Sequence, residues 1–258
     1  MSELTRPLMG WRVLVPRGGP WGDGVAAALR RIGATPVIAP MINFAPTDDS
    51  AALDDALRRL AAGEFDWITA TSATVVDVLA HHRAEIPPTT RVAAVGETTA
   101  AAFTALGYTV SKVPGRDNSA AGLLEEWDEV RTGRRLRILT LRSDVAKPVL
   151  TSGLIDLGHD VTQVVAYRTI GMPVADQIRE DVASGRFQAI LITSGSVAQQ
   201  IKDQFEELPA DVLLACVGPQ TQRDAEALGL HVNVVADERT VESLLQAVVS
   251  VADNMAGE

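Results

Sequence analysis

The amino-acid sequence predicts an internally duplicated α/β protein with parallel sheets. The stretch FDWITATSATVVDVL at 65–79 recurs as FQAILITSGSVAQQI at 187–201, and Thr71 and Thr193 lie 122 positions apart. Short apolar runs alternate with helix-like stretches of about ten residues, a pattern typical of βαβ units and parallel sheets. A repeat this long indicates a duplicated domain, because solenoid repeats span only about 20–50 residues.

A second pair of segments extends the duplication. WRVLVPRGGPWGDGVAAALRRIGATPV faces LRILTLRSDVAKPVLTSGLIDLGHDV, so that Arg17 and Arg142 lie 125 positions apart, as do Gly33 and Gly158. Each copy predicts a strand, a loop, a helix that ends at the glycine and a further strand. We call this the A segment and the segment around Thr71 or Thr193 the B segment. The chain therefore reads A, B, A, B.

The expected strands follow in that order. Those of the two A segments lie at 12–16, 34–40, 137–141 and 161–167. The first B segment adds strands at 66–70, 91–96 and 109–113, with a helix after each. The A segments end in two proline-bearing stretches, Val37–Pro46 and Tyr167–Pro173, and proline disfavours a central strand position. We expect these two stretches to link the lobes.

Composition and charge exclude several classes of protein. The chain has 258 residues, of which 47% are hydrophobic and 22% charged, an ordinary globular composition. Its formal net charge of −10 argues against non-specific nucleic-acid binding, which needs a basic face. No apolar stretch approaches the roughly 18 residues that span a bilayer, and MSELTRPLMGW lacks the layout of a signal peptide. With Cys216 as its single cysteine, we expect a cytoplasmic protein without an internal disulfide.

Hydroxyl-rich turns supply most of the candidate binding residues. Each B segment has a Thr-Ser turn and a Gly-hydroxyl turn directly after a strand and before a helix, where open parallel sheets bind ligands. Helix amino termini offer free N–H groups and a positive dipole end, which suit carboxylates. The alternative is that these residues only cap their helices. The candidates are Thr71, Ser72, Thr74, Gly96, Thr98, Thr99, Thr193, Ser194, Ser196, Gly218 and Thr221.

Charged and aromatic residues form a second group of candidates. Arg17 follows the first predicted strand, and Arg142, Ser143 and Lys147 occupy the corresponding loop of the second A segment. An arginine can bind a carboxylate through two parallel hydrogen bonds, although a solvated loop arginine is the alternative. Tyr167 ends a predicted strand. Its phenol could donate a proton, and the alternative is a packing tyrosine.

Other chemistry finds no support in the sequence. The four histidines lack metal-ligand spacing, no Ser/His/Asp set can be argued, and the glycines of RGGPWGDG do not fit G-x-G-x-x-G. Cys216 falls within the predicted strand LLACVG and is expected in the core. From the residues alone, the prediction stops at a duplicated α/β protein with an anion-binding cleft.

Taken together, the motifs resemble the uroporphyrinogen-III synthase family. The resemblance covers nearly the whole chain, and the order and spacing of the motifs are more specific than any one of them. The motifs are VLVPR, TATSATVV, VAAVGETTAAAFTALGYTV, LRSDVAKPVL, GHDVTQVVAYRT, ITSGSVAQQ, VGPQTQRDAEALG and VVADERTVESLL. The family's enzymes close linear hydroxymethylbilane into uroporphyrinogen III, inverting the last pyrrole ring through a spiro intermediate, and need no cofactor or metal.

The resemblance implies two flavodoxin-like lobes of crossed connectivity, joined by a two-strand hinge, with the active site between them. Lobe 1 would comprise 1–36 and 174–258, lobe 2 would comprise 47–166, and the links would be 37–46 and 167–173. The substrate would be a small-molecule tetrapyrrole precursor with eight carboxylates. We expect a monomer that binds neither nucleic acid nor membrane, and the resemblance leaves room for a transient contact with the upstream bilane-forming enzyme.

The resemblance also assigns roles to particular residues. Tyr167 aligns with the family's active-site tyrosine and is expected to assist departure of the terminal hydroxyl. The positions that hold carboxylates in the family align with Thr71, Ser72, Ser194 and Thr221. The chain departs from the family's patterns at Ala73, Gly195, Ser143 and Lys147, and a lysine lacks the forked geometry of arginine.

Two other functions stay open at this point. One is a catalytically silent sensor module of the same fold that binds a tetrapyrrole or another anion. The second is a two-lobed binding protein of the periplasmic type, which the missing signal peptide disfavours.

Overall fold

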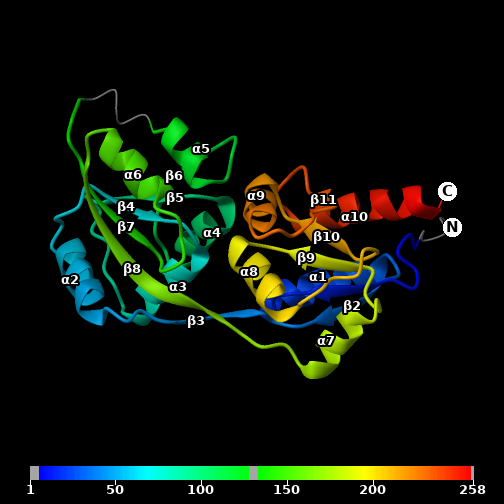
Figure 1. Ribbon diagram of the computed structural model, residues 1–258. Coiled ribbons are helices and arrows are strands. Elements are labelled where there is room, and N and C mark those ends of the chain that lie inside the picture. The colour runs from blue at the N-terminus through cyan, green and yellow to red at the C-terminus, as the bar shows by residue number, and fades with distance from the viewer. Residues whose placement is uncertain (1–5, 128–132, 257–258) are drawn as a thin grey trace. The chain divides into compact units, whose positions relative to one another are not determined.

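The computed structural model describes residues 6–127 and 133–256. It confirms the predicted α/β fold with parallel sheets (Figure 1). The chain divides into two compact units. Unit 1 takes in the chain up to Asn43 and from Ile170 onward, and unit 2 runs from Phe44 to Thr169.

Unit 1 is built on a five-stranded sheet with the order β11-β10-β9-β1-β2. All four neighbouring pairs are parallel. Its strands are β1 (Arg12–Val15), β2 (Thr35–Ile38), β9 (Ala189–Ile192), β10 (Leu213–Cys216) and β11 (Val234–Val235). Its helices are α1 (Gly19–Arg31), α7 (Asp176–Ala183), α8 (Gly195–Gln204), α9 (Pro219–Ala227) and α10 (Val241–Ala256).

Both faces of this sheet are buried, because the alternating side chains of each strand feed two separate cores. Leu14 packs with residues of α7, α8 and α9, whereas Val13 and Val15 pack with residues of α1 and α10. Cys216 lies in the first of these cores and is fully buried, as predicted. Burial raises the pKa of its thiol to about 12, so the residue is neutral at physiological pH.

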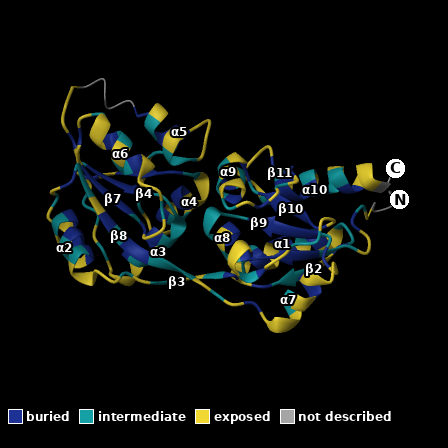
Figure 2. Cartoon of the chain, in the orientation of Figure 1, coloured by how far each residue is buried: buried dark blue, intermediate teal, exposed yellow. Residues whose placement is uncertain are grey.

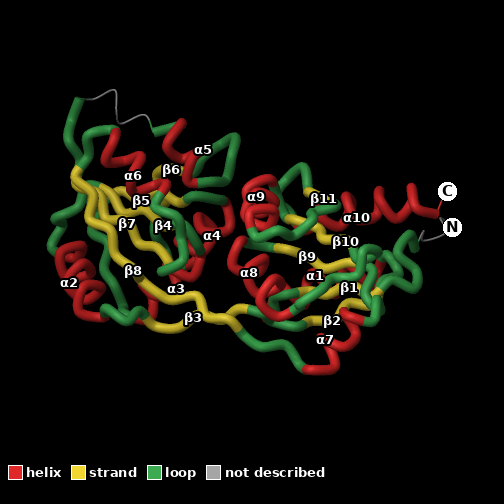
Figure 3. Tube along the Cα trace, in the orientation of Figure 1, coloured by secondary structure: helices red, strands yellow, loops and turns green. Residues whose placement is uncertain are grey.

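Unit 2 contains most of a six-stranded sheet with the order β3-β8-β7-β4-β5-β6. The pairs from β8 to β6 are parallel. Figure 3 shows the strands in yellow and the helices in red. Its strands are β3 (Ile42–Pro46), β4 (Trp67–Ala70), β5 (Arg91–Ala94), β6 (Val110–Lys112), β7 (Arg137–Ser143) and β8 (Asp160–Gly171). Its helices are α2 (Ser50–Ala61), α3 (Ala73–His81), α4 (Glu97–Ala105), α5 (Ala120–Glu125) and α6 (Val149–Asp156).

The core of unit 2 has the same two-faced plan. Ile68 and Leu139 pack with residues of α2, α3 and α4, whereas Trp67 and Ile138 pack with residues of α5 and α6. Figure 2 shows the buried residues concentrated in the strands and on the inward sides of the helices of each unit. Each sheet is therefore covered on both sides, and its strand ends are the places left for binding.

The strands β3 and β8 carry the chain from one unit to the other and are neighbours in the sheet. The unit boundaries fall after Asn43 and after Thr169, within the stretches expected to be links. Two sequence-based expectations need correction here. Tyr167 does not end its strand, because β8 continues beside β3 to Gly171.

The second correction concerns Arg142 and Ser143, which were expected in a loop. Both belong to β7, because the β7–β8 ladder extends far enough to pair Arg142 with Val165 and Ser143 with Tyr167. Of the predicted loop at 142–147, only Asp144 onward lies outside the strand.

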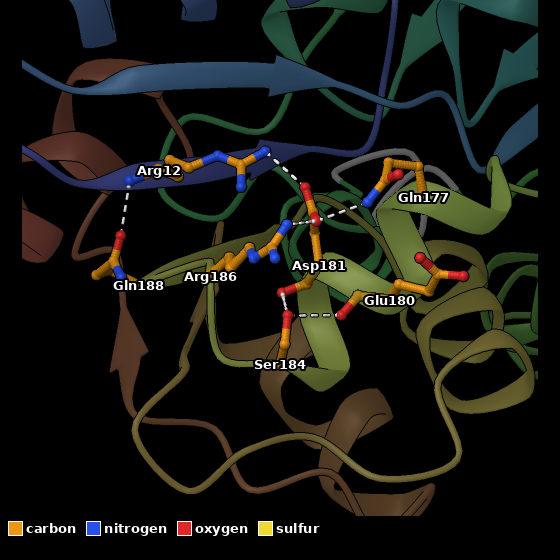
Figure 4. Close-up of polar contacts among 7 residues, drawn as sticks. All are labelled: Arg12, Gln177, Glu180, Asp181, Ser184, Arg186 and Gln188. Carbon is orange, nitrogen blue, oxygen red and sulfur yellow. Dashed lines mark hydrogen bonds and ion pairs between the residues drawn. The ribbon is translucent and has the colours of Figure 1, made fainter.

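At the amino edge of the unit 1 sheet, a buried aspartate ties α7 to β1 (Figure 4). Asp181 is only 7% exposed and accepts hydrogen bonds from Arg12 at 2.9 Å and from Arg186 at 2.8 Å. Gln177 donates to the same carboxylate at 3.0 Å. The hydrogen bond from Arg12, and then that from Gln177, hold the pKa of Asp181 below its ordinary value. Beside this cluster, Gln188 Oε1 accepts the backbone N–H of Arg12 at 2.8 Å.

The amino edge of unit 2 repeats one of these contacts. Asp66 accepts the backbone N–H of Arg137 at 2.8 Å and is ion-paired with Arg134 at 2.6 Å. Asp66 lies 122 positions before Gln188, and Arg137 lies 125 positions after Arg12. The same side-chain-to-backbone bond therefore joins the same two strands of both repeats.

Candidate active site

The predicted site residues gather at the carboxyl ends of the parallel strands, opposite the amino-edge contacts. In unit 2, Thr71 and Ser72 follow β4, and Ser72 is the N-cap of α3. Gly96 follows β5 as the N-cap of α4. Because Ala70 of β4 pairs with Ala94 of β5 and Leu141 of β7, these turns and the end of β7 share one edge of the sheet.

Ser72 and Tyr167 form the most defined contact at this edge. Their hydroxyl oxygens lie 2.8 Å apart, a hydrogen bond in which either can donate. Tyr167 is 6% exposed, and its ring meets that of Phe44 edge-on, with centroids 5.3 Å apart and planes at 86°. The phenol of Tyr167 is thus held by one hydrogen bond and one aromatic contact.

A register shift in the β7–β8 ladder explains why Tyr167 reaches Ser72. Arg142 pairs with Val165, but the next residue, Ser143, pairs with Tyr167, so that Ala166 is an extra residue on β8. Side chains of a regular strand alternate between faces, yet Ala166 and Tyr167 both join the core that contains α3. Such irregularities re-aim side chains and are common beside active sites.

The end of β7 and the loop that follows it carry two of the predicted cations, Arg142 and Lys147. The Nη1 of Arg142 donates to the backbone carbonyl of Ala146, while its Nε is buried without a hydrogen-bond partner among the described residues. Asp144 Oδ1 accepts the N–H of Thr169 at 2.9 Å, which fastens the loop to β8. Lys147 is exposed in the same loop, and Ser143 is buried at 6% exposure.

The α4 turn is lined by a residue that sequence reasoning missed. A Cβ at Gly96 would lie 3.4 Å from the Cβ of Asn118, which belongs to the loop before α5. Thr98 is exposed, whereas Thr99 is buried at 5% exposure. Glu126 holds the neighbouring loop by accepting the N–H of Gly115 at 2.9 Å, and this bond lowers the pKa of Glu126.

In unit 1, the α8 turn after β9 carries Thr193, Ser194 and Ser196. Ser194 caps α8, because its Oγ accepts the N–H of Val197 at 3.3 Å. The hydroxyl of Thr193 is buried without a hydrogen-bond partner among the described residues. At Gly195, one of the departures from the family's pattern, a Cβ would lie 2.8 Å from a carboxylate oxygen of Asp224 on α9, so a larger residue would require that side chain to move.

The α9 turn after β10 carries Gly218 and the buried Thr221, which is 3% exposed. A Cβ at Gly218 would lie 3.1 Å from Cγ of Arg239, in the loop before α10, so an arginine that sequence reasoning missed packs on this turn. Arg17 follows β1 and places its guanidinium 5.1 Å from the ring of Trp21.

Within each unit the structure thus brings several predicted residues together. In unit 2, Ser72, Tyr167 and Ser143 are linked by a hydrogen bond and by strand pairing. In unit 1, the α8 and α9 turns lie at neighbouring strand ends, because Ile192 of β9 pairs with Cys216 of β10. Within residues 6–127 and 133–256, no three His, Cys, Asp or Glu side chains are grouped so as to hold a metal ion. None of the helices in these ranges is long and apolar enough to cross a membrane.

Comparison with known proteins identifies the family to which the chain belongs. Residues 23–246 match the family described as uroporphyrinogen-III synthase HemD. This chain belongs to the uroporphyrinogen-III synthase family. It is 27% identical over 262 positions to the uroporphyrinogen-III synthase of Synechococcus elongatus, a match that covers 94% of this chain and 96% of that one.

A further relative is the porphyrin biosynthesis protein HemD of Ruminiclostridium josui. It is 24% identical over 260 positions, which cover 96% of this chain and 50% of that protein. This chain therefore spans about half the length of that relative.

Two solved structures share the fold. A mutant uroporphyrinogen III synthase of Thermus thermophilus matches with a TM-score of 0.66 at 18% identity, over 95% of this chain and 99% of that one. The uroporphyrinogen-III synthetase of Helicobacter pylori matches with a TM-score of 0.60 at 15% identity, over 93% and 99%. The resemblance read from the motifs is confirmed by the family match.

Proposed function

We propose that this chain closes hydroxymethylbilane into uroporphyrinogen III, with inversion of the last pyrrole ring. The observation that carries the proposal is the family match over residues 23–246. It is supported by the buried Tyr167, whose hydroxyl lies at the carboxyl edge of a parallel sheet, where ligands bind in open α/β folds.

In this proposal Tyr167 assists the first chemical step. The terminal C–O bond of the bilane breaks, its oxygen takes a proton and leaves as water, and an azafulvenium cation forms. The substituted carbon of the last pyrrole ring, at the other end of the bilane, bonds to the methylene carbon of this cation and gives a spiro intermediate. The bond between that ring carbon and its original bridging methylene then breaks, and the released methylene bonds to the free α-carbon of the same ring, which inverts the ring. A phenol within reach of the departing oxygen can supply the proton.

The protein's larger task is to hold the bilane in the conformation that gives inversion. Loosely held substrate closes without inversion, so most of the catalysis is positioning. We assign the carboxylates of the substrate to the helix amino termini of α3, α4, α8 and α9, where N–H groups and hydroxyls are concentrated. The proposed side chains at these turns are Thr71, Ser72, Thr74, Thr98, Thr99, Thr193, Ser194, Ser196 and Thr221, beside the backbones of Gly96 and Gly218.

The cations Arg17, Arg142 and Lys147 are proposed to pair with further carboxylates, and Ser143 supports the end of β7. We add Arg239 to this set, because its side chain packs on the Gly218 turn. Asn118 occupies the corresponding place on the Gly96 turn and would offer an amide instead. Arginine binds a carboxylate through two parallel hydrogen bonds. We therefore expect the α9 turn, with Arg239, to bind a substrate carboxylate more tightly than the α4 turn, with Asn118.

The lobe architecture is part of the proposal. We infer two flavodoxin-like lobes from one duplication, with crossed connectivity and a two-strand hinge at 37–46 and 167–173. In support, matching strands by repeat gives both sheets the same spatial order, 2-1-3-4-5, with β1 or β7 as strand 1. Monomeric state and a transient contact with the bilane-forming enzyme rest on the resemblance alone, whereas a cytoplasmic location rests on the single cysteine, Cys216.

The test is the isomer ratio of uroporphyrinogen formed from freshly made hydroxymethylbilane, with and without the protein. Isomer III should dominate in the presence of the protein, and the uninverted isomer I should dominate in its absence. Tight product binding without any change in the isomer ratio would overturn the proposed enzyme activity and favour a sensor module.

A further inference from the structure

The α3 and α8 turns hold two equivalent serines that make different hydrogen bonds. Ser72 and Ser194 lie 122 positions apart, and both are N-caps with extended backbones, at φ −155° and ψ 156° and at φ −166° and ψ 164°. Ser194 accepts the N–H of Val197, as an N-cap serine ordinarily does. Ser72 makes no such bond, and its Oγ lies 2.8 Å from the phenol of Tyr167.

The local structure allows Ser72 to leave the capping role. The N–H of Val75, the amide that corresponds to Val197 in α8, bonds to the backbone carbonyl of Ser72 at 3.2 Å. Losing the side-chain cap therefore leaves this amide satisfied. The register shift at Arg142 and Ser143 then brings Tyr167 onto the face of the sheet that α3 covers.

We propose that Ser72 is a positioning residue for Tyr167: its hydroxyl donates to the phenol oxygen and so leaves the phenol proton for the substrate. This inference rests on the proposed function. A phenol has one proton, so it cannot donate both to Ser72 and to the departing oxygen. The two hydroxyls can bond in either direction, and only the one in which Ser72 donates leaves Tyr167 ready to act.

The proton balance of the step follows from this geometry. The C–O bond breaks with its electron pair on oxygen, the phenol proton moves to that oxygen, and water leaves. The phenolate that remains on Tyr167 accepts the Ser72 hydroxyl hydrogen in a charge-assisted bond, which is stronger than the neutral one. The closing ring loses a proton when its pyrrole regains aromaticity, and that proton restores the phenol.

A double-mutant cycle tests the coupling between the two residues. Ser72→Ala should lower kcat by about 2- to 10-fold with little change in KM, the size expected for one hydrogen bond. In a Tyr167→Phe background the same Ser72→Ala change should have no further effect on kcat, because there is no phenol left to position. Ser72→Thr, which keeps the hydroxyl, should restore most of the rate.

A spectroscopic readout separates positioning from support of the fold. The chain has two tyrosines, Tyr108 and Tyr167, so Tyr108→Phe leaves a single signal when tyrosine is labelled with ¹³C at Cζ. Ser72→Ala in that background should shift the signal, because the phenol loses its hydrogen-bond partner. Tyr108 bonds to the carbonyl of Ala84 at 2.8 Å, and its removal should leave the Tyr167 signal in place.

The outcomes distinguish this inference from the proposed function. If the unaltered protein does not increase the share of isomer III in the product, the proposed function is refuted, and the inference is refuted with it. If the unaltered protein does raise isomer III, three results overturn the inference alone. They are an unmoved ¹³Cζ signal, additive losses in the cycle, or a Ser72→Ala effect confined to KM, which would leave Ser72 with only the carboxylate-binding role of the proposed function.

Discussion

The two edges of the sheets differ in how closely the two units match. At the amino edges the repeats keep the same bond, in which Gln188 or Asp66 accepts the backbone N–H of Arg12 or Arg137. At the carboxyl edges the repeats diverge, because Ser194 caps its own helix while the equivalent Ser72 binds Tyr167.

This contrast separates stability from chemistry. The amino-edge bond ties the first residue of β1 or β7 to the residue before the neighbouring strand, so we expect it to contribute to the stability of both units. The carboxyl edge faces the ligand in α/β sheets, so differences between repeats there change binding without disturbing the core. In the proposed function the chemical step therefore belongs to unit 2, where Tyr167 lies, and the turns at the helix starts hold the substrate.

The largest expected effect comes from a substitution at Tyr167, the residue that distinguishes the carboxyl edge of unit 2. Tyr167→Phe should cut turnover by about 10²-fold or less, the low end for a general acid, because positioning does much of the work. Product affinity should change little, since the phenyl ring remains. Steady-state kinetics and product titration measure both quantities.

The matched control is Tyr108→Phe, which removes the other tyrosine hydroxyl and should leave turnover unchanged. Tyr167→Ala would open a cavity in the core and should lower the free energy of unfolding by about 3 kcal/mol. A fully active Phe variant beside an unstable Ala variant would make Tyr167 a packing residue.

A smaller effect tests whether the amino edges are equivalent. Asp66→Ala should lower the free energy of unfolding by about 2 kcal/mol, because a charge-assisted bond to Arg137 N–H is lost, and Gln188→Ala should lower it by about 1 kcal/mol. The ion pair with Arg134 adds little, since that arginine side chain is 67% exposed. Urea denaturation measures both values. If neither variant lowers the free energy of unfolding, the amino-edge bonds do not stabilise the units.

The capping difference predicts a still smaller and more local effect. Ser194→Ala should cost about 1 kcal/mol of unfolding free energy and speed amide exchange at Val197, because the α8 cap is lost. Ser72→Ala should leave exchange at Val75 unchanged, because that amide bonds to a backbone carbonyl. Hydrogen exchange followed by NMR compares the two amides. Equal acceleration at both would mean that Ser72 caps α3 in solution.

The smallest effect is a pH dependence of stability that arises from Asp181 in unit 1. The pKa of Asp181 lies below its ordinary value of about 3.8, so the folded state favours the ionised carboxylate. Its stabilising contribution is present above that ordinary value and is lost as pH falls through the lowered pKa. The difference in melting temperature between the unaltered protein and Asp181→Asn should therefore be constant near neutral pH and shrink in acid. A melting-temperature difference that grows as the pH falls would contradict the lowered pKa of Asp181.

Much of this picture could be predicted from the sequence, for physical reasons. Apolar β-branched runs and glycine caps mark strands and helix ends locally, and the repeat offsets show which segments correspond. The family and the α/β fold with parallel sheets followed and are confirmed. The assignment of Arg142 and Ser143 to a loop was wrong. Their polar side chains suggested a loop, whereas their pairing with β8 can be seen only in the folded structure.

The contacts of the site itself could not be predicted. Ser72 and Tyr167 are 95 positions apart, and their meeting depends on one extra residue in the β7–β8 ladder. Arg239 and Asn118 were missed because they differ in type, so the repeat pattern gives no signal for them. Their proximity to Gly218 and Gly96 depends on how two loops fold back over the helix starts.

The isomer ratio from a single turnover of hydroxymethylbilane tests the assignment of the chemical step to unit 2 most directly, with the unaltered protein, Tyr108→Phe and Tyr167→Phe measured side by side. The unaltered protein and Tyr108→Phe should give almost only uroporphyrinogen III. Tyr167→Phe should be slower and should release some of the uninverted isomer, because spontaneous closure gains time. An unaltered protein that yields the same mixture as buffer, or a Tyr167→Phe variant as fast and as selective as the unaltered protein, would contradict the account.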